Sequence, residues 1–296
     1  MTVSIIIPTY GRSEYLPRAV KSVLSQTYKD LEVIIVNDNI PGSEEDLATT
    51  EVIKSFMIYD DRIKHIHTKG KTGGGAARNF GLKKCTGDYI AFLDDDDRYL
   101  PDKIEKQLEF TMSNGLDMSY QDVQWVNEDE KVVEYRRHNR VKDFSKKGLM
   151  RVHLLTSIAP TSIYMVKRSA MTDTCLFGEV PRGQDFFFMA SCIEAGLKIG
   201  YMPGAYVVQY LHEGERISVG PKFIENVNEE WKEKRRLAEG VLNEKEKRLL
   251  EFRLNCVCGF ACARGHEKKE AIPYFIKAFT ISPAASFREA IRYLRK

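Results

Sequence analysis

The chain has 296 residues, of which 43% are hydrophobic and 29% are charged, and its 45 Lys and Arg against 42 Asp and Glu leave a net charge of +3. This apolar content excludes a disordered chain, and so small a net charge gives no reason to expect nucleic-acid binding, which needs a clustered basic face. No apolar run reaches the roughly 20 residues that span a bilayer, and the first residues predict a strand and not a signal peptide, so the sequence indicates a cytoplasmic protein.

The first hundred residues alternate short apolar runs with segments of helical periodicity. We expect four strands, at Val3 to Ile7, Leu31 to Val36, Ile63 to His67 and Tyr89 to Leu93. Between them we expect helices that begin at Leu16, Glu44 and Ala76. This alternation predicts an α/β fold with a Rossmann-like, mainly parallel central sheet flanked by helices. In such sheets ligands bind at the carboxyl ends of the strands.

The second half of the chain has a more mixed pattern. A helix is expected from Pro101 and another from Asp185 to Ala195, with strands near Met118 to Val126, Ile163 to Lys167 and Ala205 to Leu211. After Pro221 the sequence shows only charged amphipathic helices. We therefore expect two domains, residues 1–221 and a C-terminal helical region at 222–296.

Four successive aspartates, Asp94 to Asp97, directly follow the fourth apolar strand. In an extended backbone alternate side chains share a face, so Asp94 and Asp96 are expected on one side and Asp95 and Asp97 on the other. One such pair offers hard oxygen ligands to Mg²⁺ or Mn²⁺, with the other positions left for water and substrate phosphates. The alternative is a solvated acidic turn in front of the next helix.

A glycine-rich stretch runs from Lys69 to Asn79. It lacks the first glycine of a phosphate-binding P-loop, because position 65 is His. It predicts a loop that enters a helix with Arg78 in its first turn, where backbone amides and a guanidinium can meet phosphate. A plain helix-entry loop is the alternative.

Five segments resemble, in the same order, the serial motifs of family 2 glycosyltransferases, which have the GT-A fold. These segments are Ser4 to Tyr10, Ala19 to Tyr28, Leu31 to Asp38, Ala77 to Leu82 and Gly87 to Asp97. The resemblance covers about residues 1–215. It implies an inverting transferase that uses a nucleotide sugar, with a UDP-linked sugar as the expected donor, and a divalent metal, Mn²⁺ or Mg²⁺. It also implies nucleotide-sugar binding at about 1–100 and an acceptor side at about 101–221.

Carried over residue by residue, the resemblance assigns two groups of side chains. Asp96, together with Asp94, matches the metal ligands of the D-x-D motif. The residues assigned to the nucleotide sugar are Pro8, Thr9, Tyr10, Arg12, Asp38, Arg78, Asp94 and Asp95. The second motif departs from the family, whose acidic pair is followed by Gly-Ser, since here the segment reads Asn37-Asp38-Asn39-Ile40.

Transfer with inversion requires a carboxylate that takes the proton from the attacking acceptor hydroxyl. The segment from Pro181 to Phe188 resembles the Glu-Asp motif of the family, with Gln184 in the place of the Glu and Asp185 as the general base. The alternative role for Asp185 is that of a helix N-cap. His212 matches a segment that closes over the diphosphate, so it is expected to bind metal or phosphate, with a structural histidine as the alternative.

The basic excess of the chain lies in its tail. Residues 222–296 hold 17 Lys and Arg against 11 Asp and Glu, a net charge of +6, whereas residues 1–221 carry −3. Phe287, Ile291 and Leu294 alternate with basic residues in a pattern that suits a peripheral contact with an anionic membrane. The alternatives are a single tetratricopeptide-like unit and a helical bundle packed on the catalytic domain.

These features together predict a metal-dependent inverting glycosyltransferase that acts in the cytoplasm on a glycan or lipid-linked glycan acceptor, for a bacterial surface polysaccharide. A phosphatase of the haloacid dehalogenase type also uses a strand that ends in Asp-x-Asp, but it has that strand near the start of its domain. A nucleotide-sugar or glycan-binding protein without catalysis is the second alternative, because Asn37 and Gln184 depart from the family pattern.

Overall fold

The computed structural model describes residues 1–211, 221–265 and 268–294. The chain forms two compact units, one made of residues 1–149 and 158–212 and the other of residues 150–157 and 213–296. The sequence placed the boundary near residue 221. It did not show that residues 150–157, the end of helix α5 (Lys146–Thr156) and the residue after it, group with the C-terminal unit.

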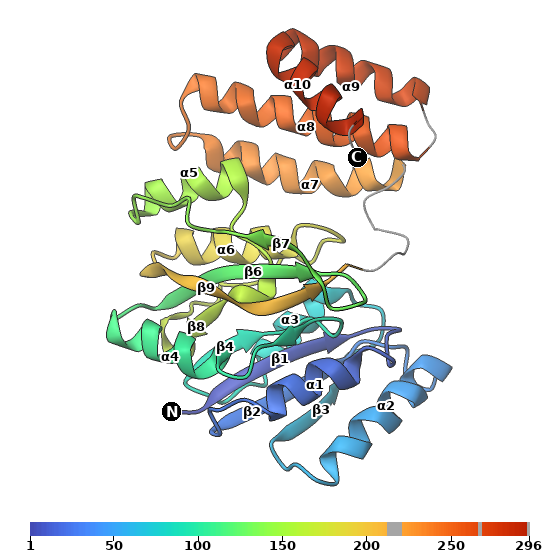
Figure 1. The fold of residues 1–296 in the computed structure, drawn as a ribbon, viewed down its shortest axis with the longest axis vertical. Helices are drawn as coiled ribbons and strands as arrows, with labels where there is room; N and C mark the ends of the chain where they lie inside the picture. Colours follow the sequence, from blue (N-terminus) through green and yellow to red (C-terminus); the bar gives the residue numbers. More distant parts are fainter. Residues whose placement is uncertain (212–220, 266–267, 295–296) are drawn as a thin grey trace. The chain divides into compact units, whose positions relative to one another are not determined.

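The first unit is built on a nine-stranded sheet (Figure 1). Its first four strands are β1 (Val3–Thr9), β2 (Leu31–Asn37), β3 (Ile63–His67) and β4 (Tyr89–Phe92). They are all parallel and lie in the order β3-β2-β1-β4. Every residue of β1, β2 and β4 is buried, which a sheet covered on both faces requires. The four predicted strands are therefore confirmed, and their carboxyl ends meet at one edge.

Three helices pack against these strands, namely α1 (Leu16–Leu24), α2 (Glu44–Met57) and α3 (Gly74–Leu82). Helix α3 lies so close to the sheet that a Cβ at Gly81 would approach Ile6 to 2.6 Å. Glycine at this position therefore lets α3 rest on β1 and β2, and it sets the position of Arg78 on the same helix.

The other strands are β5 (Arg98–Tyr99), β6 (Met118–Val126), β7 (Val132–Arg136), β8 (Met165–Lys167) and β9 (Ile199–Tyr210). β8 is antiparallel to β4 and to β6, β9 is parallel to β6 and antiparallel to β5, and β7 is antiparallel to β6. Because β4 and β6 are both antiparallel to β8, β6 and β9 run in the same direction as the first four strands, and only β5, β7 and β8 run the opposite way. The expected mainly parallel sheet is thus confirmed, with three antiparallel strands in it. The sequence missed β5, which has two residues, and β7, which is exposed throughout and has no apolar alternation.

Two further helices belong to this unit, α4 (Lys103–Ser113) and α6 (Gln184–Glu194). α6 is held by aromatic packing, because the ring of Phe188 stacks on Phe177 with centroids 4.2 Å apart and meets Phe92 of β4 edge-on at 5.3 Å. The start of α6 therefore lies beside the carboxyl end of β4.

The second unit is helical in its described residues. Its helices are α7 (Pro221–Ala238), α8 (Glu244–Arg264), α9 (Lys268–Ile281) and α10 (Pro283–Leu294). A capping box between Asn243 and Glu246 starts α8, and Arg151 donates to the same Glu246 at 2.6 Å. Within the described parts of the chain, no helix is both long and apolar enough to cross a membrane.

Candidate functional site

The four aspartates after β4 form a tight turn and not an extended segment, since the amide of Asp97 donates to the carbonyl of Asp94 at 3.1 Å. Their burial still alternates, with Asp95 and Asp97 only 5% and 3% exposed and Asp94 and Asp96 half-buried. A solvated acidic turn is therefore excluded. The helix that follows has Asp102 as its N-cap residue, without a side-chain cap.

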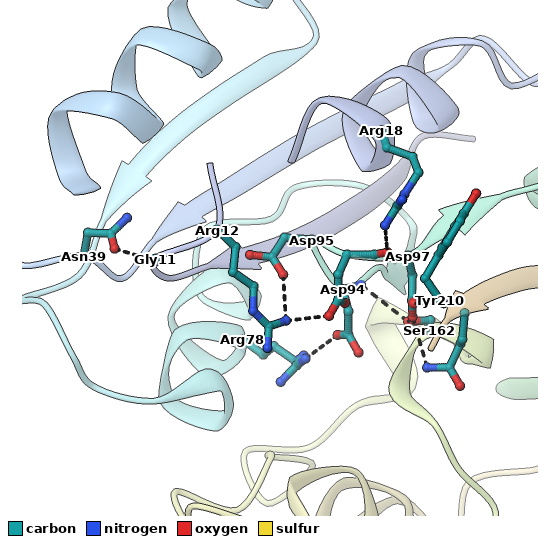
Figure 2. A network of polar contacts seen from close by, with 12 residues as sticks. Gly11, Arg12, Arg18, Asn39, Arg78, Asp94, Asp95, Asp97, Ser162 and Tyr210 are labelled. Carbon is teal, nitrogen blue, oxygen red and sulfur yellow. Dashed lines mark hydrogen bonds and ion pairs between the residues drawn. The ribbon is translucent and has the colours of Figure 1, made fainter. Parts of the chain in front are cut away.

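Two arginines face this turn (Figure 2). Arg12, in the loop after β1, places Nη1 2.5 Å from Asp96 Oδ2 and 3.5 Å from Asp95 Oδ1. Arg78, in the first turns of α3, forms an ion pair with Asp94. Arg12 is about half exposed, whereas Arg78 is 8% exposed. The sequence-predicted residues Arg12, Arg78, Asp94, Asp95 and Asp96 thus come together in one network.

The close, partly buried carboxylates of the acidic turn repel one another, and nearby positive charge reduces this repulsion. Burial, and next the charge of Asp96, raise the pKa of Asp95 to about 7. Nε of Arg78 is buried without a hydrogen-bond partner in the described structure. Both observations fit a site that takes a cation and an anionic ligand together.

Asp97 points away from this network and ties it to β9 (Figure 2). Its carboxylate accepts from Gln209 Nε2 at 3.0 Å, from the amide of Tyr210 at 3.4 Å and from the hydroxyl of Ser162 at 3.4 Å. Arg18 of α1 donates to the carbonyl of Asp96, and its guanidinium carbon lies 3.5 Å from the centroid of the Tyr210 ring. The acidic turn is therefore fixed from both sides, by α1 and by the end of β9.

Asp38 follows β2 and is 3% exposed. Its carboxylate accepts from the amides of Thr72 and Gly73 at 3.0 and 2.8 Å, from the Thr72 hydroxyl at 2.6 Å and from the Thr68 hydroxyl. In this structure Asp38 thus anchors the glycine-rich loop that leads to Arg78. The sequence did not reveal this role, because the donors lie 30 to 35 residues away.

Asp185 is the second residue of α6, whose N-cap is Gly183 with a left-handed φ of 76°. The N-cap role considered for Asp185 is therefore wrong, and its Oδ1 accepts instead from the amide of Phe186 at 2.8 Å. Asp185 is half-buried. Its neighbour Gln184 accepts from Arg78 Nη1 at 2.9 Å, so the start of α6 is bonded to the residue that pairs with Asp94.

The other residues predicted for the site lie at the end of β1, just after it, or outside the described residues. Pro8 and Thr9 are buried at the end of β1, and the carbonyl of Thr9 accepts from the amide of Asp38 at 2.9 Å. Tyr10 is 46% exposed. His212 lies outside the described residues. The sequence did not single out Arg18 and Tyr210. Their contacts with Asp96 and Asp97 join segments 78 and 113 residues apart and leave no local signal.

In the described ranges, no group of three or more His, Cys, Asp and Glu side chains is arranged to hold a metal ion. A hard cation does not need such a cage when one or two carboxylates and the phosphate oxygens of a ligand complete its shell. Asp96 and Asp94 are half-buried, and each is already paired with an arginine. Their neighbour Asp95 has a pKa raised by burial and then by the crowded negative charge of this turn. These residues therefore fit a divalent cation bound in this way.

Comparison with known proteins gives a consistent result. A family model described as glycosyl transferase family 2 matches residues 4–173. An uncharacterized glycosyltransferase of Rickettsia bellii is 43% identical over 132 residues, which are 45% of this chain and 18% of that protein. The putative teichuronic acid biosynthesis glycosyltransferase TuaG of Bacillus subtilis is 36% identical over 118 residues, 40% of this chain and 45% of that protein.

An uncharacterized glycosyltransferase of Methanocaldococcus jannaschii is 32% identical over 194 residues, 64% of either chain. The chain thus covers less than two thirds of the length of each of these three relatives. Among solved structures, a TarS fragment of S. aureus in complex with UDP-GlcNAc matches 97% of this chain and 83% of its own, with a TM-score of 0.65 and 18% identity.

The mannosyltransferase PcManGT of Pyrobaculum calidifontis, in complex with GDP-Man and Mn²⁺, matches 99% of this chain and 79% of its own, with a TM-score of 0.63 and 15% identity. At these identities the two structures show a shared fold, which is the GT-A fold expected from the sequence.

Proposed function

Because the chain belongs to glycosyl transferase family 2, we propose that it moves a sugar, with inversion, from a UDP-linked donor to a hydroxyl of a glycan or lipid-linked glycan. Membership of this family excludes the phosphatase alternative. The observation that carries the proposal is the bonded path from Asp94 through Arg78 to Gln184, which joins the acidic turn to the helix that bears Asp185.

The donor end of the site is the carboxyl edge of β1, β2 and β4. Arg12 and Arg78 supply positive charge there, and Asp38 holds the glycine-rich loop in place. A nucleotide diphosphate carries negative charge that guanidinium groups bind well. Two solved structures of the same fold contain UDP-GlcNAc and GDP-Man, which supports a nucleotide-sugar donor and leaves the choice of UDP as our proposal.

Asp96 and Asp94 would hold the metal, Mn²⁺ or Mg²⁺. When bound, a divalent cation neutralises the charge that develops on the departing diphosphate. The Mn²⁺ of PcManGT supports a divalent cofactor in this fold. The role of His212 as a further ligand stays a proposal that rests on the sequence alone.

Asp185 would accept the proton of the attacking hydroxyl. It lies in the first turn of α6, where it is half-buried and its carboxylate already accepts a backbone hydrogen bond. The general base and the metal ligand must be different carboxylates, because a carboxylate that coordinates a metal ion cannot also accept the proton of the acceptor hydroxyl. The placement of Asp185 on a different element from the acidic turn supports this division.

The test compares Asp185→Asn with Asp96→Asn, using a panel of nucleotide sugars with Mn²⁺ or Mg²⁺. We expect Asp185→Asn to retain donor binding and to lose transfer by about 10²–10⁴-fold. Asp96→Asn should lose metal-dependent donor binding. Full transfer by Asp185→Asn would disprove the base assignment, and metal-independent transfer would disprove the metal role. Donor binding without transfer by the unmodified chain, with every acceptor, would favour a binding protein instead.

We also propose that the enzyme works in the cytoplasm with a peripheral contact to an anionic membrane through its C-terminal helices. Ile272, Ile276 and Phe279 lie along one face of α9, and each is more than half exposed. The net charge of +6 over residues 222–296 complements anionic lipid. Sedimentation with phosphatidylglycerol vesicles should fall for Ile276→Ser/Phe279→Ser and not for Ile58→Ser, a control on the exposed residue after α2. Equal sedimentation of the three proteins would disprove this contact.

A further inference from the structure

Arg78 joins two parts of the site that come from distant segments of the chain. One terminal nitrogen pairs with Asp94 of the acidic turn, and the other donates to Gln184 Oε1 at 2.9 Å, across 106 residues (Figure 2 shows the pair with Asp94). A guanidinium is planar and rigid, so two groups bonded to its two ends are held at a set separation.

The surroundings of Arg78 prevent it from leaving this position. The residue is 8% exposed, and its guanidinium carbon lies 5.5 Å from the centroid of the Phe177 ring. The next residue, Asn79, donates to the carbonyl of Phe177 at 3.0 Å and accepts from its amide at 2.9 Å. Helix α3 is therefore attached at two successive residues to the segment that precedes α6.

Gln184 makes two hydrogen bonds of opposite direction, which a glutamate could not do. Its Oε1 accepts from Arg78, while its Nε2 donates to the carbonyl of Val180 at 3.0 Å. A carboxylate can accept from Arg78 but has no hydrogen to donate to a carbonyl. A Cβ at Gly74 would lie 2.9 Å from Gln184 Oε1 and 3.0 Å from Arg78 Nη1, so glycine at position 74 leaves room for the bridge.

We propose that Arg78 and Gln184 are positioning residues that hold the start of α6, and with it Asp185, at a set distance from the acidic turn. This inference rests on the proposed function for its kinetic consequence, but the bridge itself can be measured without transfer. A displacement of the base by about 1 Å can lower the rate about 10²-fold without loss of donor binding.

The test uses Gln184→Ala and Gln184→Glu, with Arg62→Lys as the control. Arg62 forms a bidentate pair with Asp60 just before β3, at the opposite end of the strand from the site. We expect Gln184→Ala to lower kcat about 10- to 100-fold and to change the affinity for UDP in Mn²⁺ less than about threefold. Gln184→Glu, which can still accept from Arg78 but cannot donate to the carbonyl of Val180, should recover only part of kcat.

Amide hydrogen exchange of residues 185–188, measured without nucleotide, is the second readout. Exchange should accelerate in Gln184→Ala and in Arg78→Lys, since lysine lacks the planar fork whose two nitrogens bond Asp94 and Gln184, and it should not change in Arg62→Lys. Unchanged exchange in both bridge variants would overturn the inference, as would a loss of UDP affinity in Gln184→Ala that matches its loss of kcat. Absence of transfer by the unmodified enzyme would instead count against the proposed function, and the exchange readout would still decide on the bridge.

Discussion

The guanidinium of Arg12 and the carboxylate of Asp96 form an ion pair of 2.5 Å at the position proposed for the metal. Arg12 also lies 3.5 Å from Asp95, whose pKa burial raises to about 7. Its side chain is 46% exposed, so it can leave the pair without opening the core. Arg12 therefore supplies positive charge to the acidic turn at the position proposed for a divalent cation.

Arg12→Gln should lower the stability of the metal-free protein, because it leaves Asp95 and Asp96 without their nearest cation. The pair is half exposed, so we expect a loss of about 1 kcal/mol, or about 2–4 °C in Tm. Saturating Mn²⁺ should restore most of that loss. The measurement is thermal unfolding with EDTA and with Mn²⁺.

Arg136→Gln is the matched control for this prediction, since Arg136 has a similar exposure of 44% and pairs with Glu134 at 3.3 Å. Mn²⁺ should raise its Tm no more than that of the unmodified protein. If Mn²⁺ raises the Tm of Arg12→Gln and of Arg136→Gln by the same amount, the Arg12 guanidinium does not stand where the metal ion binds.

Two adjacent glycines at the start of α3 should respond differently to alanine. A Cβ at Gly75 would lie 2.1 Å from the carbonyl oxygen of Gly178, which is backbone and cannot turn aside. A Cβ at Gly74 meets only the ends of the Gln184 and Arg78 side chains. Gly75→Ala should therefore cost about 1–3 kcal/mol or more. Gly74→Ala should cost less than Gly75→Ala, because the ends of two side chains can shift where a backbone carbonyl cannot, although this shift disturbs the bridge between Arg78 and Gln184. Calorimetric unfolding that ranks Gly74→Ala below Gly75→Ala would contradict this packing.

Glu32 should make the stability of the fold depend on pH in the acid range. This β2 residue is 5% exposed and accepts from Ser4, Lys64 and Thr86, and these bonds outweigh burial and lower its pKa from 4.5 to about 2. The unfolded chain binds the proton more readily, so the contribution of Glu32 is complete above about pH 4.5 and is lost as the pH falls towards 2.

Glu32→Gln should therefore lose about 3 kcal/mol at pH 7, and the difference from the unmodified protein should shrink below pH 4.5. The control is Glu14→Gln, the same substitution at an exposed glutamate outside β2. A stability difference for Glu32→Gln that is the same at pH 3 and pH 7 would refute the assignment.

The sequence predicted the parts of the site whose signal is local. Apolar runs located β1 to β4, and the polar residues after them located the acidic turn and Asp38. The pairing of Arg78 with Gln184 and the packing of Arg18 on Tyr210 join segments more than 100 residues apart, so no periodicity encodes them. The strand β7 was missed for another reason, because all its residues are exposed and it has no buried face to reveal.

The departure of Asn37 from the acidic pair of the family has a structural explanation. Asn37 is fully buried, and its Nδ2 donates to Asp46 Oδ1 at 2.8 Å, while its Oδ1 accepts from the amide and the side chain of Asn39 at 3.0 and 2.9 Å. An aspartate at position 37 would set a second buried carboxylate against Asp46. The amide is therefore matched to an acidic partner on α2.

Asn37→Asp should destabilise the protein by about 3–5 kcal/mol at pH 8, because it replaces a donor by a like charge in the core. Asn37→Asp/Asp46→Asn should regain most of that loss, since the amide introduced at position 46 can donate to the new carboxylate and can still accept from the amide of Gly42, which now bonds Asp46 at 2.9 Å. Asp46→Asn alone should be less harmful than Asn37→Asp, as it adds no charge. Thermal unfolding of the four proteins forms a double-mutant cycle. If the double variant is no more stable than Asn37→Asp, the charge of Asp46 is not the reason for the amide at position 37.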